Sequence, residues 1–260
     1  MRTRKWIQAS ILLFMGLYFL DNMLSGKINL YINSDRFAWL SWIGTALFLL
    51  LGVMSVIDLI REKPDTETDQ HDHEGHDHAA HDHGHDHSHE QAPSWFKLIL
   101  VGIPLMVGLL VPAKPLGAAA VSNGGISTSF SSAQNSPTSF NIAPADRTVL
   151  DWVRAFNESS DVKQFAGQTA DVTGFVYRDI RFDGKPQLMV ARFVISCCVA
   201  DASAIGVIVQ TADAAKWPQD GWVHVTGKFT TQTIDGRDTP VVLADSITPA
   251  TQPEHPYLYP

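Results

Sequence analysis

Residues 37–60 read FAWLSWIGTALFLLLGVMSVIDLI, and this stretch decides the fold class. It is almost continuously apolar. A helix needs about 20 such residues to cross the hydrocarbon of a bilayer. The stretch therefore predicts a transmembrane helix, and the chain cannot be read as a purely soluble protein.

Two further apolar runs flank it, Trp6 to Leu24 and Trp95 to Val111. The first follows Arg2, Arg4 and Lys5 but has no small-residue cleavage site, so we interpret it as a retained helix and not as a signal peptide. The second flanking run is shorter and contains Pro104, so an interfacial or re-entrant segment is its alternative. Together the runs predict about three transmembrane helices.

The distribution of basic residues predicts the topology. Six of them fall on one side of the expected spans, and only Lys27, Arg36 and Lys114 fall on the other; the six are Arg2, Arg4, Lys5, Arg61, Lys63 and Lys97. Basic residues favour the cytosolic side. We therefore expect a plasma (inner) membrane protein, with its N-terminus cytosolic and everything after Val111 periplasmic or extracellular.

Between the second and third runs lies a histidine tract, HDHEGHDHAAHDHGHDHSH at residues 71–89. Imidazole and carboxylate suit borderline divalent ions such as zinc, nickel or copper(II). The tract predicts a mobile metal-collecting loop, and a low-complexity linker with no metal role is the alternative. The candidate ligands are the nine histidines His71, His73, His76, His78, His81, His83, His85, His87 and His89.

The C-terminal part has the pattern of a small β domain. Residues 117–145 are rich in Ser, Gly and Ala and predict a flexible tether. Asp146 is the expected cap of a helix whose apolar face carries Val149, Trp152, Val153 and Phe156. Five β-rich runs follow, which suit a partly open barrel of the OB type, with a small sandwich as the alternative; they are Gln168–Tyr177, Gln187–Ile195, Ile205–Gln210, Trp222–Phe229 and Pro240–Ile247.

Cys197 and Cys198 are the only cysteines in the chain. With Asp201, and with His224 as a further candidate, they could form a soft-metal or thiol site. Consecutive residues of a regular strand point to opposite faces, so both sulfurs reach one ion only across a bulge or at a strand end. Burial as small hydrophobic side chains is the alternative.

Four short motifs resemble those of an uncharacterised bacterial membrane-protein family. They are Ser25-Gly26-Lys27, Pro112-Ala113-Lys114-Pro115-Leu116-Gly117, Arg192-Phe193 leading into Cys197-Cys198-x-x-Asp201, and Pro253-x-x-Pro256-Tyr257-Leu258-Tyr259. Members of that family look like the smaller partner of a predicted two-component permease. The resemblance covers nearly the whole chain and implies a role beside a larger multi-span permease in the same membrane.

We therefore expect a membrane α-helical protein with a C-terminal, mainly β, OB-like domain, divided into five parts. They are two transmembrane helices in 1–62, a cytosolic His/Asp-rich loop in 63–94, a third transmembrane helix in 95–112, a flexible linker in 113–145 and the β domain in 146–260.

The predicted function is a non-enzymatic permease subunit in divalent metal homeostasis, with zinc or another divalent transition metal and no organic cofactor. No phosphate-binding loop, nucleophile elbow or zinc-protease motif is present in the sequence. A net charge of -8 opposes a nucleic-acid groove. A membrane-tethered thiol or redox domain that uses Cys197 and Cys198 is the alternative function.

Overall fold

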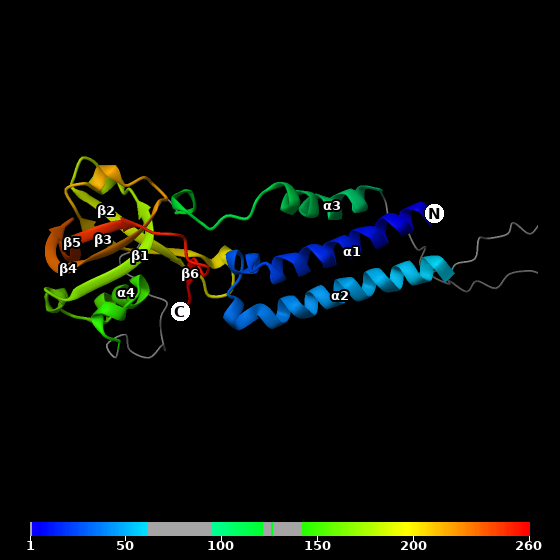
Figure 1. Ribbon diagram of the computed structural model, residues 1–260, viewed down its shortest axis with the longest axis horizontal. Helices are drawn as coiled ribbons and strands as arrows, with labels where there is room; N and C mark the ends of the chain where they lie inside the picture. The colour runs from blue at the N-terminus through cyan, green and yellow to red at the C-terminus, as the bar shows by residue number, and fades with distance from the viewer. Residues whose placement is uncertain (1, 62–94, 122–125, 127–141) are drawn as a thin grey trace, which may run out of the picture. The chain divides into compact units, whose positions relative to one another are not determined.

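The computed structural model describes residues 2–61, 95–121, 126 and 142–260 (Figure 1). Its contacts divide the chain into two compact units. The helical unit comprises Met1–Leu24 and Leu40–Pro112, and the β unit comprises Ser25–Trp39 and Ala113–Pro260. The short segment 25–39 therefore belongs with the β domain, although apolar runs flank it in the sequence.

Three helices contribute to the helical unit: α1 (Arg2–Leu24), α2 (Ser34–Arg61) and α3 (Trp95–Leu110). Among the described residues, α1 and α2 are the helices long and apolar enough to cross a membrane. The predicted third span corresponds to α3, which has 16 residues and contains Pro104. Because a perpendicular span needs about 20 residues, two helices of spanning length are found where three were predicted.

Helices α1 and α2 approach closely where each carries a glycine. A Cβ atom on Gly16 would lie 2.6 Å from the Leu49 side chain, and one on Gly52 would lie 2.7 Å from Leu13. Small residues let helix backbones approach in this way, which increases van der Waals contact between helices in lipid.

Helix α4 (Val149–Glu158) contributes to the core of the β unit. Its cap is Thr148, which forms a reciprocal capping box with Asp151. The predicted cap Asp146 is wrong, because that residue lies in a preceding 3₁₀ turn, Pro144–Asp146. Trp152 and Val153 are fully buried, as the apolar face of the helix predicted.

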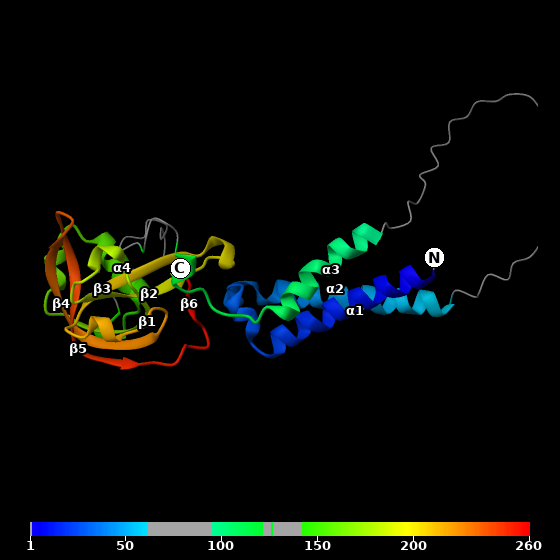
Figure 2. The ribbon, with the colours of Figure 1, turned by 90° about the horizontal axis from the view of Figure 1, so that it is seen from above.

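All five predicted strands are present, and a short sixth was not predicted. They are β1 (Thr169–Tyr177), β2 (Gln187–Val194), β3 (Ser203–Gln210), β4 (Trp222–Ile234), β5 (Arg237–Pro249) and β6 (Tyr257–Leu258). The β4–β5 hairpin is longer than expected because its turn is tight (Figure 2). Asp235 and Gly236 both have positive φ there, which is the backbone of a type I′ hairpin turn.

The strands are ordered β1-β4-β5-β3-β2-β6, and β1 also pairs with β2. Strands β1, β2, β3, β5 and β4 thus form a closed ring. All of these pairings are antiparallel except that of β3 with β5. The short strand β6 pairs in parallel with the end of β2, where Phe193 lies opposite Tyr257 and Val194 lies opposite Leu258.

Strand β2 is buried on both of its faces, which explains its almost continuous apolar sequence. One face contributes Val190 to a core that includes Trp152 of α4. The other contributes Phe193 to a second core that includes Ile126 and Tyr257. The second core thus joins residues from before α4 and from the C-terminal tail, and it lies beside the loop that follows β2.

Candidate functional site

The loop after β2 holds both cysteines at the end of the strand. Cys197 is exposed and Cys198 is partly exposed. Their sulfur atoms are 3.6 Å apart. The alternation of a regular strand does not apply here because β2 ends at Val194, and this removes the geometric objection to both sulfurs facing one ligand.

Asp201 fixes the shape of this cysteine loop, residues 196–201. Its carboxylate accepts the backbone N–H of Ser196 at 2.9 Å and that of Cys197 at 2.8 Å. The backbone N–H of Asp201 in turn donates to the carbonyl of Cys198 at 3.0 Å. The carboxylate thus closes the loop on itself and lies next to the first thiol.

A hydrogen bond to Asp201 also sets the protonation of Cys197. The hydrogen bond with Asp201, followed by that with Cys198, raises the pKa of Cys197 to about 11. Burial works against the ionised form of Asp201, but hydrogen bonds from Cys197 and from the loop backbone outweigh it and lower the pKa of the carboxyl. Since the thiolate is the nucleophile, a protonated Cys197 is a poor redox nucleophile at neutral pH.

The connection between α1 and α2 pairs with the cysteine loop. Ile32 and Cys198 form an antiparallel bridge. The N–H of Asn33 donates to the Cys197 carbonyl at 3.0 Å, and the N–H of Val199 donates to the Tyr31 carbonyl at 2.9 Å. These contacts anchor the start of α2, because the Asn33 carbonyl accepts the N–H of Phe37 in the first turn of that helix.

The Asn33 side chain strengthens this pairing. Asn33 is 5% exposed, and its Nδ2 donates to the Ser196 carbonyl at 3.3 Å. Its Oδ1 is buried and has no hydrogen-bond partner within the part of the chain that the structure describes. The Asn33 side-chain amide therefore links the α1–α2 connection to the cysteine loop, and its Oδ1 is an acceptor without a partner among the described residues.

The C-terminal tail lies against the same connection. The Tyr257 hydroxyl donates to the Leu30 carbonyl at 3.3 Å and accepts the N–H of Leu116 at 3.0 Å. Burial raises the pKa of Tyr257, so the hydroxyl stays protonated and can donate. One phenol thus links three segments that are far apart in the sequence.

Arg192 anchors the tail from inside the β domain. Its guanidinium donates to the carbonyls of Pro256 (3.0 Å), His255 (3.0 Å) and Thr173 (3.3 Å). It also lies 5.2 Å from the ring centroid of Trp222. Burial lowers the pKa of Arg192 to about 10, which leaves it charged at neutral pH, with carbonyl dipoles as its hydrogen-bond partners.

Three of the four motifs noted in the sequence therefore meet the residues that follow the fourth, Ser25-Gly26-Lys27, in one region, which we call the junction. It consists of residues 25–33, 113–117, 192–201 and 253–259. The pairings above join each of these segments to another within the β unit. Sequence reasoning identified the motifs but missed their contact and the roles of Asn33 and Arg192; the signal that could have revealed Arg192 is an arginine within a strand of apolar residues.

The structure describes only some of the predicted metal ligands. The nine histidines from His71 to His89 lie outside the described residues. Within residues 2–61, 95–121, 126 and 142–260, no group of three or more His, Cys, Asp or Glu side chains is placed to hold a metal. His224 contacts Asp171 at 2.5 Å across β4 and β1 and does not join the cysteines. The site of Cys197, Cys198 and Asp201 stays a prediction.

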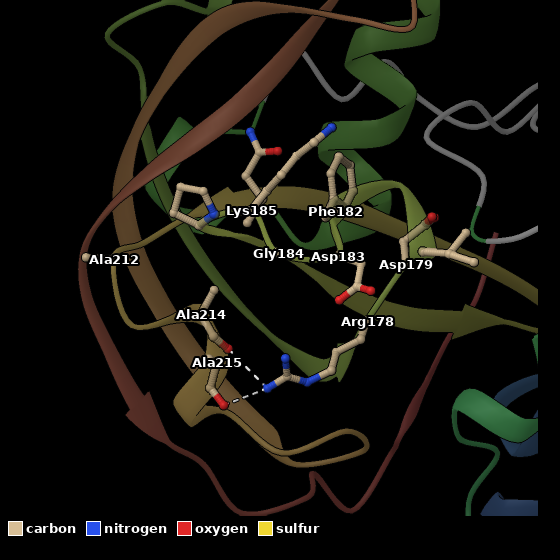
Figure 3. Close-up of a pocket in the computed structure, with 12 residues that line it drawn as sticks. Arg178, Asp179, Phe182, Asp183, Gly184, Lys185, Ala212, Ala214 and Ala215 are labelled. Atoms are coloured by element: carbon tan, nitrogen blue, oxygen red, sulfur yellow. Dashed lines mark hydrogen bonds between the residues drawn. The ribbon is translucent and has the colours of Figure 1, made fainter.

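A separate cleft of about 640 Å³ lies between the β1–β2 and β3–β4 connections. Figure 3 shows Arg178 reaching across it to the carbonyls of Ala214 and Ala215, at 3.2 and 2.8 Å. A third carbonyl, that of Trp217, accepts from the same nitrogen at 2.6 Å. Arg178 therefore joins the two connections and defines the shape of the cleft.

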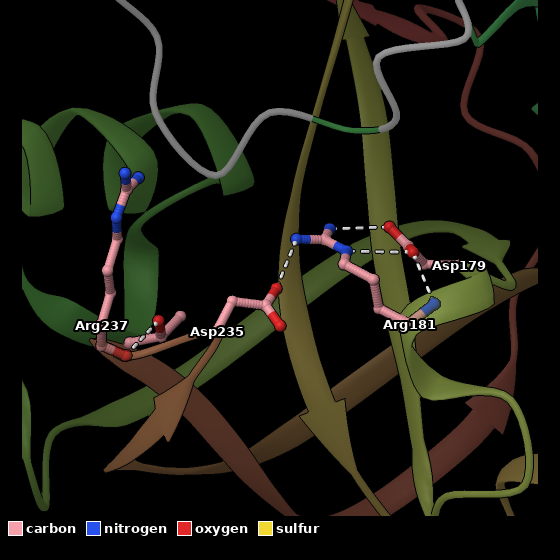
Figure 4. Close-up of polar contacts among 5 residues, drawn as sticks. Asp179, Arg181, Asp235 and Arg237 are labelled. Atoms are coloured by element: carbon pink, nitrogen blue, oxygen red, sulfur yellow. Dashed lines mark hydrogen bonds and ion pairs between the residues drawn. The ribbon is translucent and has the colours of Figure 1, made fainter.

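A charged cluster lies next to a smaller cleft of about 340 Å³. Arg181 is held by Asp179 through bonds of 3.0 and 2.7 Å and faces Asp235 at 3.7 Å, whereas Arg237 points away (Figure 4). The hydrogen bond to Arg181 lowers the pKa of Asp179 and raises that of Arg181. This pairing gives the cluster a structural role in the β1–β2 connection.

Comparisons with known proteins agree with this division of the chain. The DUF1980 N-terminal domain matches residues 7–127, and the DUF1980 C-terminal domain matches residues 132–260. The fold therefore defines a protein with an apolar helical part and a C-terminal sheet domain. More narrowly, the chain belongs to the DUF1980 family, whose two domains it carries in order.

The chain is similar to two named bacterial proteins. A Streptococcus mutans protein named "Putative two-component membrane permease complex subunit" is 26% identical over 287 residues, covering 94% of each chain. The UPF0703 protein YcgQ of Bacillus subtilis is 30% identical over 98 residues, covering 37% of this chain and 34% of that one.

A solved structure, a small single-stranded DNA-binding protein from Streptomyces coelicolor, is 16% identical and matches with a TM-score of 0.21. It covers 32% of this chain and 93% of that one. A score this low carries no conclusion about fold or ligand.

Proposed function

We propose that this protein is a non-enzymatic, membrane-anchored accessory subunit of a permease. The observation that carries the proposal is the junction, which ties the β domain to the connection between the two long apolar helices. A free-standing binding protein on a tether has no need of such a link. The name and the full-length similarity of the Streptococcus mutans relative support the permease role.

The junction also supports a membrane topology. Residues 25–33 and the β domain are bonded to each other, so they lie on one side of the bilayer. If α2 spans, its end at Arg61 lies on the opposite side, and the chain must return before Ala113. Helix α3 is the described apolar helix in that interval, so it crosses, and local thinning of the bilayer accommodates its 16 residues.

The distribution of basic residues orients this arrangement. It puts the N-terminus and residues 62–94 in the cytosol and the β domain outside the plasma membrane. The β domain itself is the OB-like barrel predicted from the sequence, an inference supported by its closed five-strand ring with a parallel β3–β5 pair.

Thiol labelling in intact cells tests the orientation. Cys197 is exposed, so a membrane-impermeant maleimide should label the native protein from outside. The matched control is Gly84→Cys in a Cys197→Ser, Cys198→Ser background, which should be labelled only after permeabilisation. Labelling of native cysteines only after permeabilisation overturns the external location.

Affinity purification in mild detergent tests the permease role. The tagged protein should bring down one polytopic membrane protein in fixed stoichiometry, and an unrelated tagged membrane protein should not. Recovery of a free monomer contradicts the proposal.

Within this function, the His71–His89 tract supplies a metal-collecting loop for zinc or a similar divalent ion. Imidazole ligands support this role by chemistry alone. Competition titration with zinc, nickel and copper should show that deletion of residues 71–89 removes most of the bound ions. Equal binding by the intact and deleted chains rejects the loop as a metal site.

A further inference from the structure

We propose that Cys197 and Cys198 form an exposed two-thiol site that binds a single thiophilic cation of the d¹⁰ class, such as zinc or copper(I). The proposal concerns the junction alone and does not depend on the permease partner or on the histidine tract.

The spacing of the two sulfur atoms carries the proposal. They lie 3.6 Å apart. Two thiolates on a tetrahedral ion with bonds of about 2.3 Å are separated by about 3.8 Å. The pair therefore already has close to the separation needed to chelate one ion, and only a small side-chain movement is required.

The backbone around the pair is fixed before any ion binds. The Cys197 N–H is held by Asp201 and its carbonyl by the N–H of Asn33. The Cys198 carbonyl accepts the N–H of Asp201, and the neighbouring N–H of Val199 is held by Tyr31. Such preorganisation lowers the entropy cost of binding.

Charge at the loop favours a cation. The Asp201 carboxylate lies beside Cys197, and each of its two oxygens accepts one backbone N–H. The carboxylate also accepts the Cys197 thiol, and loss of the thiol proton on metal binding frees that acceptor site for the ion or an ion-bound water. A divalent ion displaces one proton from each thiol on binding, so the bound pair carries two thiolates.

The shortage of further ligands defines the kind of site. Structural zinc sites are closed by four protein ligands. The described residues provide two adjacent thiols and no cluster of three or more metal-ligating side chains. A partly exposed site with open positions exchanges its ion readily, which suits capture and transfer better than a structural role.

Cadmium titration of the full-length protein in detergent tests this assignment. Thiolate-bound Cd²⁺ absorbs in the ultraviolet through charge transfer, whereas imidazole-bound Cd²⁺ does not, so the readout is blind to the histidine tract. We expect one Cd²⁺ per chain with the band of two sulfur ligands, and an unchanged band after deletion of residues 71–89.

The variants Cys197→Ser and Cys198→Ser should each weaken Cd²⁺ binding at least tenfold, and Ser196→Ala is the matched control that should retain it. A wild-type protein with no band, or with one Cd²⁺ shared by two chains, overturns the proposal. The proposal is also overturned if either Cys197→Ser or Cys198→Ser binds Cd²⁺ as tightly as the wild-type protein.

A second measurement needs no substitution in the site. Bound Cd²⁺ should protect both native cysteines of the wild-type chain from alkylation, as read by mass spectrometry of the intact protein. Alkylation of either thiol at its metal-free rate, under saturating Cd²⁺, counts against two-thiol chelation even if the serine variants fail to fold.

Discussion

The backbone N–H of Asn33 donates to the carbonyl oxygen of Cys197 at 3.0 Å. This bond joins the residue that precedes α2 to the first of the two adjacent thiols. Any ligand that restrains the cysteine loop thus also restrains the peptide from which α2 begins. Within the β unit, backbone contacts join residues 31–33 to the cysteine loop, and side-chain substitutions alone do not easily remove such contacts.

A designed disulfide should capture this pairing. The bonds from Asn33 to Cys197 and from Val199 to Tyr31 flank Ile32 and Cys198, which makes them a non-hydrogen-bonded antiparallel pair with Cα atoms about 4.5 Å apart. That separation suits a disulfide. The variant Ile32→Cys with Cys197→Ser should therefore cross-link to Cys198 almost completely under mild oxidation, as read by non-reducing mass mapping.

The control for this cross-link is Ile28→Cys in the same Cys197→Ser background, because residue 28 lies in the 3₁₀ turn Lys27–Leu30 and not in the bridge. It should remain reduced under the same conditions. Equal cross-linking at both positions would show that the connection is mobile and that the bridge is not a stable contact.

The local elements could be predicted from the sequence, whereas their association could not. Five β-rich runs predicted five strands, because strand patterns are local. The bridge between Ile32 and Cys198 depends on two segments that are too short to carry a periodic signal. Strand β6 was missed for the same reason, since Tyr257–Leu258 is too short to show alternation.

The candidate site shows the same limit. The cysteines and Asp201 were found by residue type, and both sulfurs were expected to reach one ion only across a bulge or at a strand end. Residue type alone did not show that the strand-end case applies, as it does because β2 ends at Val194. The cap of α4 was misplaced because Asp146 and Thr148 are both good caps by type. Only the 3₁₀ turn at Pro144–Asp146 moves the helix start to Val149.

Replacing Arg192 with methionine should release the C-terminal tail. The substitution leaves the carbonyls of Pro256 and His255 without their charged donor. Hydrogen bonds to charged groups contribute about 1.5–3 kcal/mol, so we expect a loss of about 2–4 kcal/mol in the free energy of unfolding. Thermal unfolding in detergent and limited proteolysis of residues 250–260 measure it.

Two further variants distinguish loss of the C-terminal anchor from general destabilisation of the β domain. Arg237→Met removes an exposed arginine and should change stability little. Arg192→Lys keeps the charge but lacks the forked guanidinium that reaches three carbonyls, so it should recover only part of the loss. Full stability of Arg192→Met would disprove the anchoring role.

The pH dependence of stability should reveal the Asp179–Arg181 pair. The hydrogen bond from Arg181 lowers the pKa of Asp179 in the folded state below its unfolded value. A depressed carboxyl pKa stabilises the fold above the unfolded pKa of about 3.9, and this stabilisation is lost as the pH falls through the folded pKa. Asp179→Asn should therefore cost about 1–2 kcal/mol at pH 7.

This cost should shrink as the pH falls below about 4, which thermal unfolding of both proteins between pH 7 and pH 3 measures. Asp238→Asn is the matched control, because it breaks an exposed pair with Lys163 that is worth about 0–1 kcal/mol. A cost for Asp179→Asn that does not vary with pH would assign the effect to packing and not to the charge.

Two glycines of the β4–β5 hairpin should respond very differently to alanine, although the sequence does not distinguish them. A Cβ atom on Gly227, which lies opposite the bulge of β5, would lie 2.1 Å from the Leu243 carbonyl oxygen, a backbone atom that cannot move aside. Gly227→Ala should therefore cost about 3 kcal/mol or more.

Gly236 has φ of 76° with open space around it, so alanine there meets only the left-handed penalty of about 1–2 kcal/mol. Thermal unfolding in detergent ranks the two variants, and a Gly227→Ala protein as stable as Gly236→Ala would mean that the bulge relaxes and that its close approach does not constrain the sheet.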